Sequence, residues 1–375
     1  MKRIVFVSAT DELGGSDSSL FELVRCLDRE HWEPHVVLPG DLVHGDRYRR
    51  IGVPVHVVPL KKLKNTANLA WHLAYLLRAP ARVLRMARLL ARLRPAIVHV
   101  NTSVELLAGF AARRYCDRTG AGLVWHVREL DLRPRVVERV VFGIVERWAD
   151  AIVAISSPLG RRFAASGRVR VVHNGVDLSR FAPRPAGARR GLVLGWMGRV
   201  VPIKGVENVL ELFARVRLRV PGTSLLVVGL STAGSEAYAN DLQARALASP
   251  CGSDIDWRRG TSQPESAYVG MDLFVHLPEF EEPFGRTMIE AQACGVPVLT
   301  WRRGGLAETL EPGVTGIVVA AGDIEAAADA AVTLLSDPVR LAEMAVRARV
   351  LAAERFSSES CAARVQCVYE ELLAA

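Results

Sequence analysis

Short apolar runs alternate with longer segments of helical pattern along almost the whole chain. In the first half these runs are RIVFVSA, EPHVVLP, VPVHVVPL, AIVHVN, GLVWHV, AIVAIS and VRVVHNG. The segments between them, such as residues 16–30 and 68–93, are long enough to form crossover helices. Short, nearly continuous apolar strands separated by helices are typical of a parallel sheet that is covered on both faces.

The alternation restarts after a segment rich in Pro, Arg and Gly, FAPRPAGARRG, at residues 181–191. The runs LVLGWMG, SLLVVGL, DIDWRRG, DLFVHLP, VPVLTW and TGIVVA follow it. Because 375 residues exceed one typical core, we predict an α/β chain with two Rossmann-like domains. Residues 1–182 form the first domain and residues 183–357 the second, while residues 358–375 form a C-terminal helix that could cross back to the first. Ligands of such sheets bind at the carboxyl ends of the strands, which predicts a cleft between the two domains.

Composition excludes several classes of protein. The six cysteines are scattered, with no C-x-x-C pair and no Cys/His ligand spacing, which argues against a disulfide scaffold and a zinc site. The apolar run at the N-terminus is too short for a secretory signal, and no window reaches the roughly 18 apolar residues of a transmembrane helix. We therefore expect a cytoplasmic protein, with peripheral attachment to the inner face of the membrane as an option.

The net charge of +8 indicates an anionic partner. Nine Lys and Arg residues, and no acidic residue, lie between Lys61 and Arg94. We expect a helix to begin at Pro80 and to carry arginines at helical spacing, at positions 82, 85, 88 and 92. Such a basic amphipathic helix suits an anionic membrane surface, although an ordinary crossover helix with a solvated face has the same pattern. Nucleic acid is not expected, since aromatic residues are few here and no recognition motif is present.

Three motifs follow predicted strands, and the first is SATDELGGSDSSLFELV. Gly14 and Gly15 let the backbone approach a phosphate closely, and the following helix offers its amides. Ser16 or Asp17 would cap that helix, and a plain turn with such a cap explains the motif equally well. The loop is not G-x-G-x-x-G and the second strand ends without an acidic residue, which disfavours a nicotinamide dinucleotide.

The second motif, GWMGRVVPIKG, places Arg199 and Lys204 just beyond a strand. Two cations there can hold a diphosphate and stabilise the charge that forms when it departs. Two solvated surface cations are the alternative.

The third motif is EEPFGRTMIEAQACGVPVLT, in which RTMIEAQAC is a predicted helix that ends before Gly295. The amides near Phe284, Gly285 and Arg286 would then face an anion. Glu282 precedes the helix and Glu290 lies within it, where a carboxylate can accept hydroxyl protons of a ribose or hexose. The spacing does not fit a glycosidase pair, whose carboxyl groups flank one bond from opposite sides. A helix that is merely acidic remains the alternative.

In this order, the segments GRVVPIKG, EEPFGRTMIEAQACGVPV and GGLAETLEPGVTGIVV resemble family 4 retaining glycosyltransferases of the GT-B fold. VVHNGVDLSRFAP, before the linker, is also similar to that family's interdomain segment. The resemblance implies that Arg199 and Lys204 hold the donor diphosphate, that Glu290 binds the nucleotide ribose, and that Glu282 binds the transferred sugar. The loop HLPEFEEPFG departs from the family pattern in its additional acidic residues and in Pro283.

The resemblance implies further donor contacts from the amides around Phe284, Gly285 and Arg286. In the first domain it implies that Gly14 and Gly15 reach the phosphates. It also implies that His126, in LVWHVREL, is the active-site histidine. A buried core histidine is the alternative for His126, and His99, in AIVHVNTS, is a competing candidate.

The resemblance also implies a mechanism, a front-face transfer in which the leaving phosphate takes the acceptor's proton. A double displacement would need a carboxylate nucleophile, for which Glu129 and Asp131 remain open. The cations and helix dipoles would replace a metal ion, so we expect no metal and no cofactor. Asp254 and Asp256 match a D-x-D metal motif only superficially, because they lie at the edge of a strand that is expected near the base.

We therefore expect a glycosyltransferase that moves a hexose-like sugar from a UDP or GDP donor to an acceptor hydroxyl. The acceptor is expected to be a lipid-linked saccharide or cell-envelope glycan. A soluble small molecule such as an aminocyclitol is the alternative acceptor. The more remote alternatives for the function are a sugar-nucleotide epimerase or phosphorylase, a nicotinamide oxidoreductase and a binding module.

Overall fold

A computed structural model describes residues 1–8, 14–40, 45–60, 69–130, 132, 134–183, 191–231, 234–261 and 263–374. The chain divides into two compact units. Unit 1 comprises Met1–Gly175 and Ser358–Ala375, and unit 2 comprises Val176–Ser357. The chain thus passes from unit 1 to unit 2 slightly before residue 182, where we had placed the boundary.

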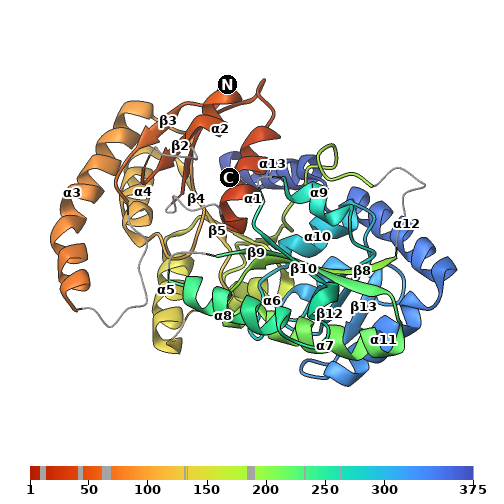
Figure 1. Ribbon diagram of the computed structural model, residues 1–375. Coiled ribbons are helices and arrows are strands. Elements are labelled where there is room, and N and C mark those ends of the chain that lie inside the picture. Colours follow the sequence, from red (N-terminus) through yellow and green to blue (C-terminus); the bar gives the residue numbers. More distant parts are fainter. Residues whose placement is uncertain are drawn as a thin grey trace. The chain divides into compact units, whose positions relative to one another are not determined.

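Unit 1 is built on a seven-stranded sheet in the order β3-β2-β1-β4-β5-β6-β7, and every pairing in it is parallel (Figure 1). The strands are the apolar runs of the first half of the chain, namely β1 (Lys2–Val7), β2 (Trp32–Leu38), β3 (Val55–Val57), β4 (Ile97–Val100), β5 (Gly122–Val127), β6 (Ala151–Ala154) and β7 (Val169–Val171). The central strands β4, β5 and β6 are buried at every position, as expected for strands covered on both faces.

The crossover segments form the helices of unit 1, which are α1 (Gly15–Arg25), α2 (Gly45–Arg50), α3 (Leu69–Leu93), α4 (Leu106–Thr119), α5 (Arg135–Trp148), α6 (Ser157–Gly160) and η1 (Arg161–Ser166). The C-terminal helix α13 (Ser358–Ala374) also belongs to unit 1 and packs against α1, β5 and β6. Its apolar side chains, including Val365 and Tyr369, are buried in the same core as Phe6 of β1. The end of the chain thus completes the core that the first strand begins.

Unit 2 contains a six-stranded parallel sheet in the order β10-β9-β8-β11-β12-β13. Its strands are β8 (Leu192–Arg199), β9 (Thr223–Leu230), β10 (Ile255–Arg259), β11 (Leu273–His276), β12 (Val298–Trp301) and β13 (Gly316–Val319). Its helices are η2 (Pro202–Lys204), α7 (Val206–Arg219), α8 (Glu236–Leu247), η3 (Gly252–Asp254), α9 (Pro264–Tyr268), α10 (Arg286–Ala293), η4 (Leu306–Thr309), α11 (Ile324–Leu335) and α12 (Pro338–Arg355). The prediction of two Rossmann-like parallel-sheet domains is confirmed.

Two local predictions are wrong. Pro80 does not begin a helix but lies inside α3, which starts at Leu69. Pro80 is exposed, so water can satisfy the backbone carbonyl that its missing N–H leaves unpaired. Helix α1 begins at Gly15 with Gly14 as its N-cap, and neither Ser16 nor Asp17 caps it.

Lys61, Lys62 and Lys64 of the basic segment, and residues 184–190 of the linker, lie outside the described residues. Within the described part of the chain, no helix is both long enough and apolar enough to span a bilayer.

Candidate active site

Arg199 and Lys204 lie at the carboxyl edge of the unit 2 sheet. Arg199 is the last residue of β8, and Lys204 ends the short helix η2 that follows. Gly205 is the N-cap of α7 with a φ of +67°, and a Cβ atom at this position would lie 1.9 Å from the carbonyl oxygen of Leu277. Only glycine allows so close an approach, which packs the Lys204 turn onto the chain segment that follows β11.

The ammonium of Lys204 pairs with the carboxylate of Glu282, with Nζ 2.7 Å from one oxygen and 3.0 Å from the other. It also lies 4.8 Å from the ring centroid of Phe280, within cation–π range. His276, the last residue of β11, places Nε2 3.4 Å from Glu282. Burial of Glu282 opposes its ionisation, but Lys204 and His276 more than offset this and lower the pKa of Glu282 to about 2. The carboxylate therefore stays charged at any physiological pH.

The loop that carries Glu282 is fixed through its backbone. The amide of Gly305 donates to the carbonyl oxygen of Glu282 at 2.8 Å, and that of Gly304 donates to the side chain of Glu281 at 2.6 Å. Gly304 has a φ of +57°, and a Cβ atom there would lie 2.2 Å from the Glu282 carbonyl oxygen. The segment around residue 304 thus acts as a rigid support for the acidic loop.

Helix α10 begins directly after this loop, with Gly285 as its N-cap at a φ of +86°. Glu290 is buried on the helix and accepts a hydrogen bond from Tyr268 at 2.9 Å and one from Arg286 at 2.7 Å. Burial, and then the Glu290 charge, raise the pKa of Tyr268 well above its ordinary value, so this hydroxyl stays a donor. Phe284 is buried with its ring edge-on to Phe356, which anchors the start of the helix.

In unit 1, Gly14 and Gly15 form the start of α1, immediately after a segment that follows β1. Ser8, at the end of β1, donates a hydrogen bond of 2.9 Å to Asp17 in the first turn of this helix. Arg47 donates to the backbone carbonyl of Asp17 at 2.8 Å. These contacts fix the start of α1 at the carboxyl edge of the sheet, where the glycines were predicted to bind phosphate.

His126 lies one residue before the end of β5 and is 2% exposed. Its Nδ1 atom is 3.3 Å from Nε2 of His99 and 3.3 Å from the guanidinium of Arg128. Arg128 is itself buried and donates to Asn101 at 2.9 Å and to Asn174 at 2.6 Å. Among the described residues, Nε2 of His126 has no hydrogen-bond partner, although it is buried. A buried ring nitrogen without a partner is costly unless a ligand satisfies it.

Sequence reasoning missed two residues of the unit 2 site, His276 and Tyr268. His276 had a local signal, because it is a polar residue at the end of an apolar strand. His126 has a similar position, one residue before the end of β5. Tyr268 had none, since its side chain reaches Glu290 only through the packing of α9 onto α10. Glu129, a candidate nucleophile, instead accepts hydrogen bonds from the amide and hydroxyl of Ser103, and Asp131 lies outside the described residues.

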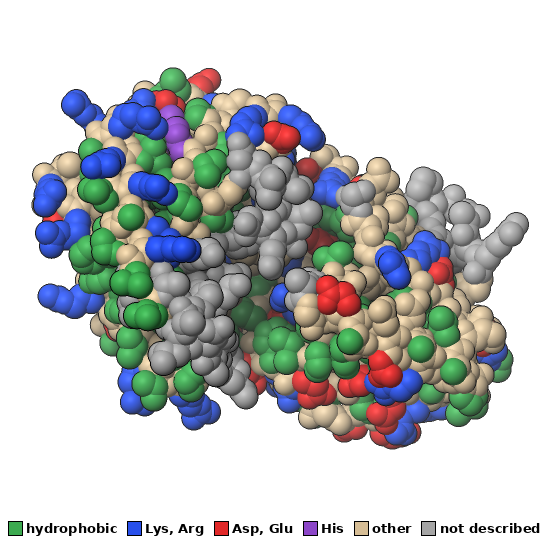
Figure 2. Space-filling view, turned by 60° about the vertical axis from the view of Figure 1, so that its left-hand side comes forward, with side chains coloured by type: hydrophobic (Ala, Val, Ile, Leu, Met, Phe, Trp, Pro, Cys, Tyr) green, Lys and Arg blue, Asp and Glu red, His purple; other side chains and the backbone are tan. Residues whose placement is uncertain are grey.

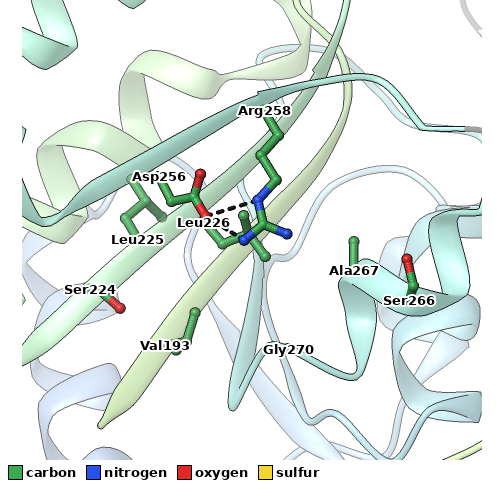
Figure 3. Close-up of a pocket in the computed structure, with 9 residues that line it drawn as sticks. All are labelled: Val193, Ser224, Leu225, Leu226, Asp256, Arg258, Ser266, Ala267 and Gly270. Carbon is green, nitrogen blue, oxygen red and sulfur yellow. Dashed lines mark hydrogen bonds and ion pairs between the residues drawn. The ribbon is translucent and has the colours of Figure 1, made fainter. Parts of the chain in front are cut away.

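The two aspartates of the D-x-D match are held by arginines. Asp256 pairs with Arg258, and Asp254 pairs with Arg217 at 2.9 Å. Asp256 lines a small cavity of about 150 Å³ together with Val193 and other residues near the amino ends of β8, β9 and β10 (Figure 3). This edge of the sheet is opposite to the one that carries Lys204 and Glu290. Within the described residues, no three His, Cys, Asp or Glu side chains gather as metal ligands would.

Comparison with known proteins assigns the two halves of the chain. The model of Glycosyltransferase Family 4 matches residues 13–180, and that of Glycosyl transferases group 1 matches residues 186–350. A GDP-mannose-dependent alpha-(1-6)-phosphatidylinositol monomannoside mannosyltransferase of Mycolicibacterium smegmatis is 30% identical over 283 residues, which are 70% of this chain and 72% of that protein. The chain belongs to glycosyltransferase family 4. The expected family and enzyme class are thereby confirmed.

Other relatives of this glycosyltransferase are D-inositol 3-phosphate glycosyltransferases. That of Mycobacterium avium is 34% identical over 203 residues, and the match spans 52% of this chain but only 47% of that protein. Among solved structures, HepE from Anabaena in complex with UDP and glucose superposes with a TM-score of 0.82 over 99% of this glycosyltransferase and 100% of HepE, at 21% identity. The likeness to HepE shows that the fold is shared.

Proposed function

We propose that this glycosyltransferase binds a nucleoside-diphosphate sugar at the carboxyl edge of the unit 2 sheet and transfers its sugar to an acceptor hydroxyl with retention of configuration. The observation that carries the proposal is the partly buried Lys204–Glu282 pair on the buried His276, which holds a cation and a carboxylate beside the start of α10. Buried charges are expensive to keep, and they persist where a ligand uses them.

The charged residues at this edge of the sheet have separate parts in donor binding. Arg199 is exposed and its side chain makes no hydrogen bond or ion pair within the described chain, so its guanidinium is open to a phosphate. Lys204 and the first amides of α10 supply further positive potential. Glu282 would accept hydroxyl protons of the sugar. Glu290, already oriented by Tyr268 and Arg286, would accept those of the ribose.

The proposed transfer step needs no carboxylate nucleophile. The bond from the anomeric carbon to the diphosphate oxygen breaks, and the acceptor oxygen bonds to that carbon on the same face. The acceptor's proton passes to the departing phosphate oxygen. The cations at Arg199 and Lys204 stabilise the charge that develops on the diphosphate, which is the part that a metal ion plays in other transferases.

The relatives support a nucleotide-sugar donor and a glycolipid acceptor. The mycobacterial relative is named for GDP-mannose and for phosphatidylinositol monomannoside, and HepE is bound to UDP and glucose. We propose UDP or GDP as the nucleotide. A lipid-linked or envelope glycan is the favoured acceptor, and a soluble molecule is the second candidate because other relatives are named for D-inositol 3-phosphate.

The exposed face of α3 favours the membrane-linked acceptor. Leu73, Leu77 and Leu84 lie on one side of the helix and are 58%, 73% and 49% exposed. Exposed arginines border them, at positions 78, 85, 88 and 92. Figure 2 shows Lys and Arg side chains interspersed with hydrophobic ones in the part of the molecule that carries α3. Exposed leucines flanked by cations, without carboxylates, suit the interface of an anionic bilayer.

A thermal-shift screen over UDP-, GDP- and dTDP-sugars tests the donor proposal. One UDP- or GDP-sugar is expected to raise the Tm of the wild-type protein, because a ligand that binds only the folded state stabilises it by about 2.7 kcal/mol at a hundred times its Kd. The same sugar without its nucleotide should leave the Tm unchanged. Mass spectrometry with glycolipid and inositol acceptors would then identify the product. No shift with any nucleotide sugar would contradict the proposal.

Vesicle sedimentation tests the membrane face. Wild-type protein is expected to sediment with vesicles that contain phosphatidylglycerol or phosphatidylinositol, and to be released at high salt, because each Arg near an anionic surface contributes about 1 kcal/mol. Leu77→Glu/Leu84→Glu should reduce binding at least about tenfold. Leu218→Glu, at an exposed leucine of unit 2 that is 82% accessible, is the matched control. Equal binding of wild type and the double variant would contradict a role for α3.

A further inference from the structure

A groove of about 440 Å³ lies between α3 and α4 of unit 1, two helices that pack side by side (Figure 1). Two of its lining residues, Arg94 and Thr119, come three residues before β4 and β5 begin. They place the groove toward the amino edge of the sheet, whereas Gly15 and His126 lie at its carboxyl edge. The proposed transfer therefore makes no use of this groove.

The floor of the groove is apolar. Ala87 and Ala91 line it from α3, and Ala111 lines it from α4. Because the side chain of alanine is a single methyl group, the two helices leave room between them. Ala87 and Ala91 follow Leu84 by three and seven residues, so they lie on the side of α3 that carries the exposed leucines. The groove thus continues the apolar face of α3 that we propose to meet the membrane.

Three cations surround this floor. Arg94, Arg114 and Arg118 line the groove, and all three side chains are exposed. Within the part of the chain that the structure describes, none of these guanidiniums donates a hydrogen bond or forms an ion pair. The one carboxylate in the sequence of α3 and α4, that of Asp117, pairs with Arg113 at 2.9 Å. The groove therefore has a positive rim that is open to an anion.

The other polar groups of the lining are already used inside the protein. The hydroxyl of Tyr115 donates to the carbonyl of Pro95 at 3.2 Å, and that of Thr119 donates to the carbonyl of Tyr115 at 2.9 Å. The walls are helices, whose backbone groups bond within each helix. An extended peptide in the groove would bury N–H and C=O groups without partners, whereas a hydrocarbon chain has no such groups. The lining thus suits an apolar chain with an anionic end.

We propose that this groove binds one molecule of an anionic phospholipid, with an acyl chain on the alanine floor and the phosphate among Arg94, Arg114 and Arg118. The bound lipid anchors the protein and is not the acceptor, because the groove lies toward the edge of the sheet opposite to His126. The site adds a specific contact to the general attraction of α3 for an anionic surface. It rests on the membrane part of the proposed function and is independent of the donor site.

Titration with a short-chain lipid tests the groove without a membrane and without a nucleotide sugar. Dihexanoyl phosphatidylglycerol, kept below its critical micelle concentration, is expected to bind wild type at a single saturable site, followed through the arginine side-chain N–H resonances in NMR spectra. Glycerol 3-phosphate has the phosphate but no acyl chain, and should bind at least about tenfold more weakly because it buries no CH₂ groups. Dihexanoyl phosphatidylcholine, whose headgroup also carries a positive charge, should bind about tenfold more weakly than phosphatidylglycerol.

Two variants separate the acyl chain from the phosphate. Ala91→Phe fills the groove and keeps every cation, so the affinities for both lipids should fall at least about tenfold. Ala91 is exposed, so the fold should tolerate the larger side chain, and thermal unfolding checks this. Arg114→Gln/Arg118→Gln keeps the groove and removes two charges, so the affinity for phosphatidylglycerol should fall to about that for phosphatidylcholine.

The matched controls make the same changes at exposed positions of unit 2. They are Ala237→Phe on α8 and Arg340→Gln/Arg347→Gln on α12, and both should bind the two lipids as wild type does. A wild-type affinity for phosphatidylglycerol in Ala91→Phe would overturn the proposal, because the lipid would then bind elsewhere. A preference for phosphatidylglycerol that survives in Arg114→Gln/Arg118→Gln would overturn the assignment of the phosphate.

Competition with hexaglutamate decides between a lipid and an acidic peptide. The peptide should not displace dihexanoyl phosphatidylglycerol at equal concentration, since it has no acyl chain for the floor. Displacement at that concentration would assign the groove to a peptide and overturn the proposal. If no nucleotide sugar stabilises wild type, the proposed transfer fails, but the lipid titration still decides what the groove binds.

Discussion

Lys204→Ala is expected to lower kcat/KM for the donor sugar at least about a hundredfold, a loss of roughly 2.7 kcal/mol of transition-state stabilisation. The substitution removes a cation from the proposed diphosphate site and leaves Glu282 without its main counter-ion. Steady-state kinetics of donor consumption would measure the loss. Arg258→Ala, which breaks an ion pair at the opposite edge of the same sheet, is the matched control and should stay close to wild type.

The same variant should also be less stable, and a second substitution separates the two effects. A fully buried carboxylate that has lost its partner costs about 3–5 kcal/mol, and the partly exposed Glu282 should cost less. In the intact pair the pKa of Glu282 is about 2, below the ordinary 4.5, so the pair stabilises the fold above pH 4.5 and loses this contribution as the pH falls toward 2. Lys204→Ala/Glu282→Gln should recover much of the unfolding free energy at pH 7 but not the turnover. Recovery of turnover in the double variant would show that Lys204 serves only to neutralise Glu282.

Glu290→Ala is expected to weaken donor binding at least about tenfold, a loss of roughly 1.4 kcal/mol. It removes the proposed ribose acceptor and leaves the Tyr268 hydroxyl, a buried donor, without its acceptor. Glu290→Gln keeps the shape and can still accept from Tyr268, so its stability should be closer to wild type while its affinity remains reduced. Isothermal titration with the nucleotide alone would measure the affinity of both variants, and thermal unfolding would measure their stability.

Glu265→Gln is the control for the Glu290 variants, because it changes a carboxylate of the neighbouring helix α9 that pairs with Arg180 and has no proposed contact with the donor. Its affinity for the nucleotide should equal that of wild type. Wild-type affinity in Glu290→Ala would remove this residue from the donor site.

Much of the fold could be predicted because the signals are local. Each strand is a short apolar run, and Gly285 and Gly295 bracket α10 with positive φ values at both ends. Helix α3 was placed wrongly because Pro80 is a strong local signal for a helix start. The missing N–H of Pro80 leaves one backbone carbonyl without its helical partner. Because Pro80 lies on an exposed face of the helix, water can satisfy that carbonyl, and α3 continues past Pro80.

The candidate site was predictable where residues lie at strand ends and not where tertiary packing joins distant segments. The pair of Lys204 with Glu282 joins residues 78 positions apart, and the sequence placed both at the donor without indicating that they touch. We treated His99 and His126 as competing candidates for the active-site histidine, because each is a polar residue in an apolar run. The parallel register sets β4 beside β5 and brings the two rings together, so they belong to one network.

The most direct measurement is a crystal structure of the full chain with the nucleotide sugar that stabilises it. The diphosphate should lie within about 3 Å of the Arg199 guanidinium and the Lys204 ammonium, with the ribose hydroxyls on Glu290 and the sugar hydroxyls near Glu282. A nucleotide bound elsewhere, for example in the cavity lined by Asp256 and Arg258, with Lys204 and Glu290 contacting only protein atoms, would contradict the donor site described for unit 2.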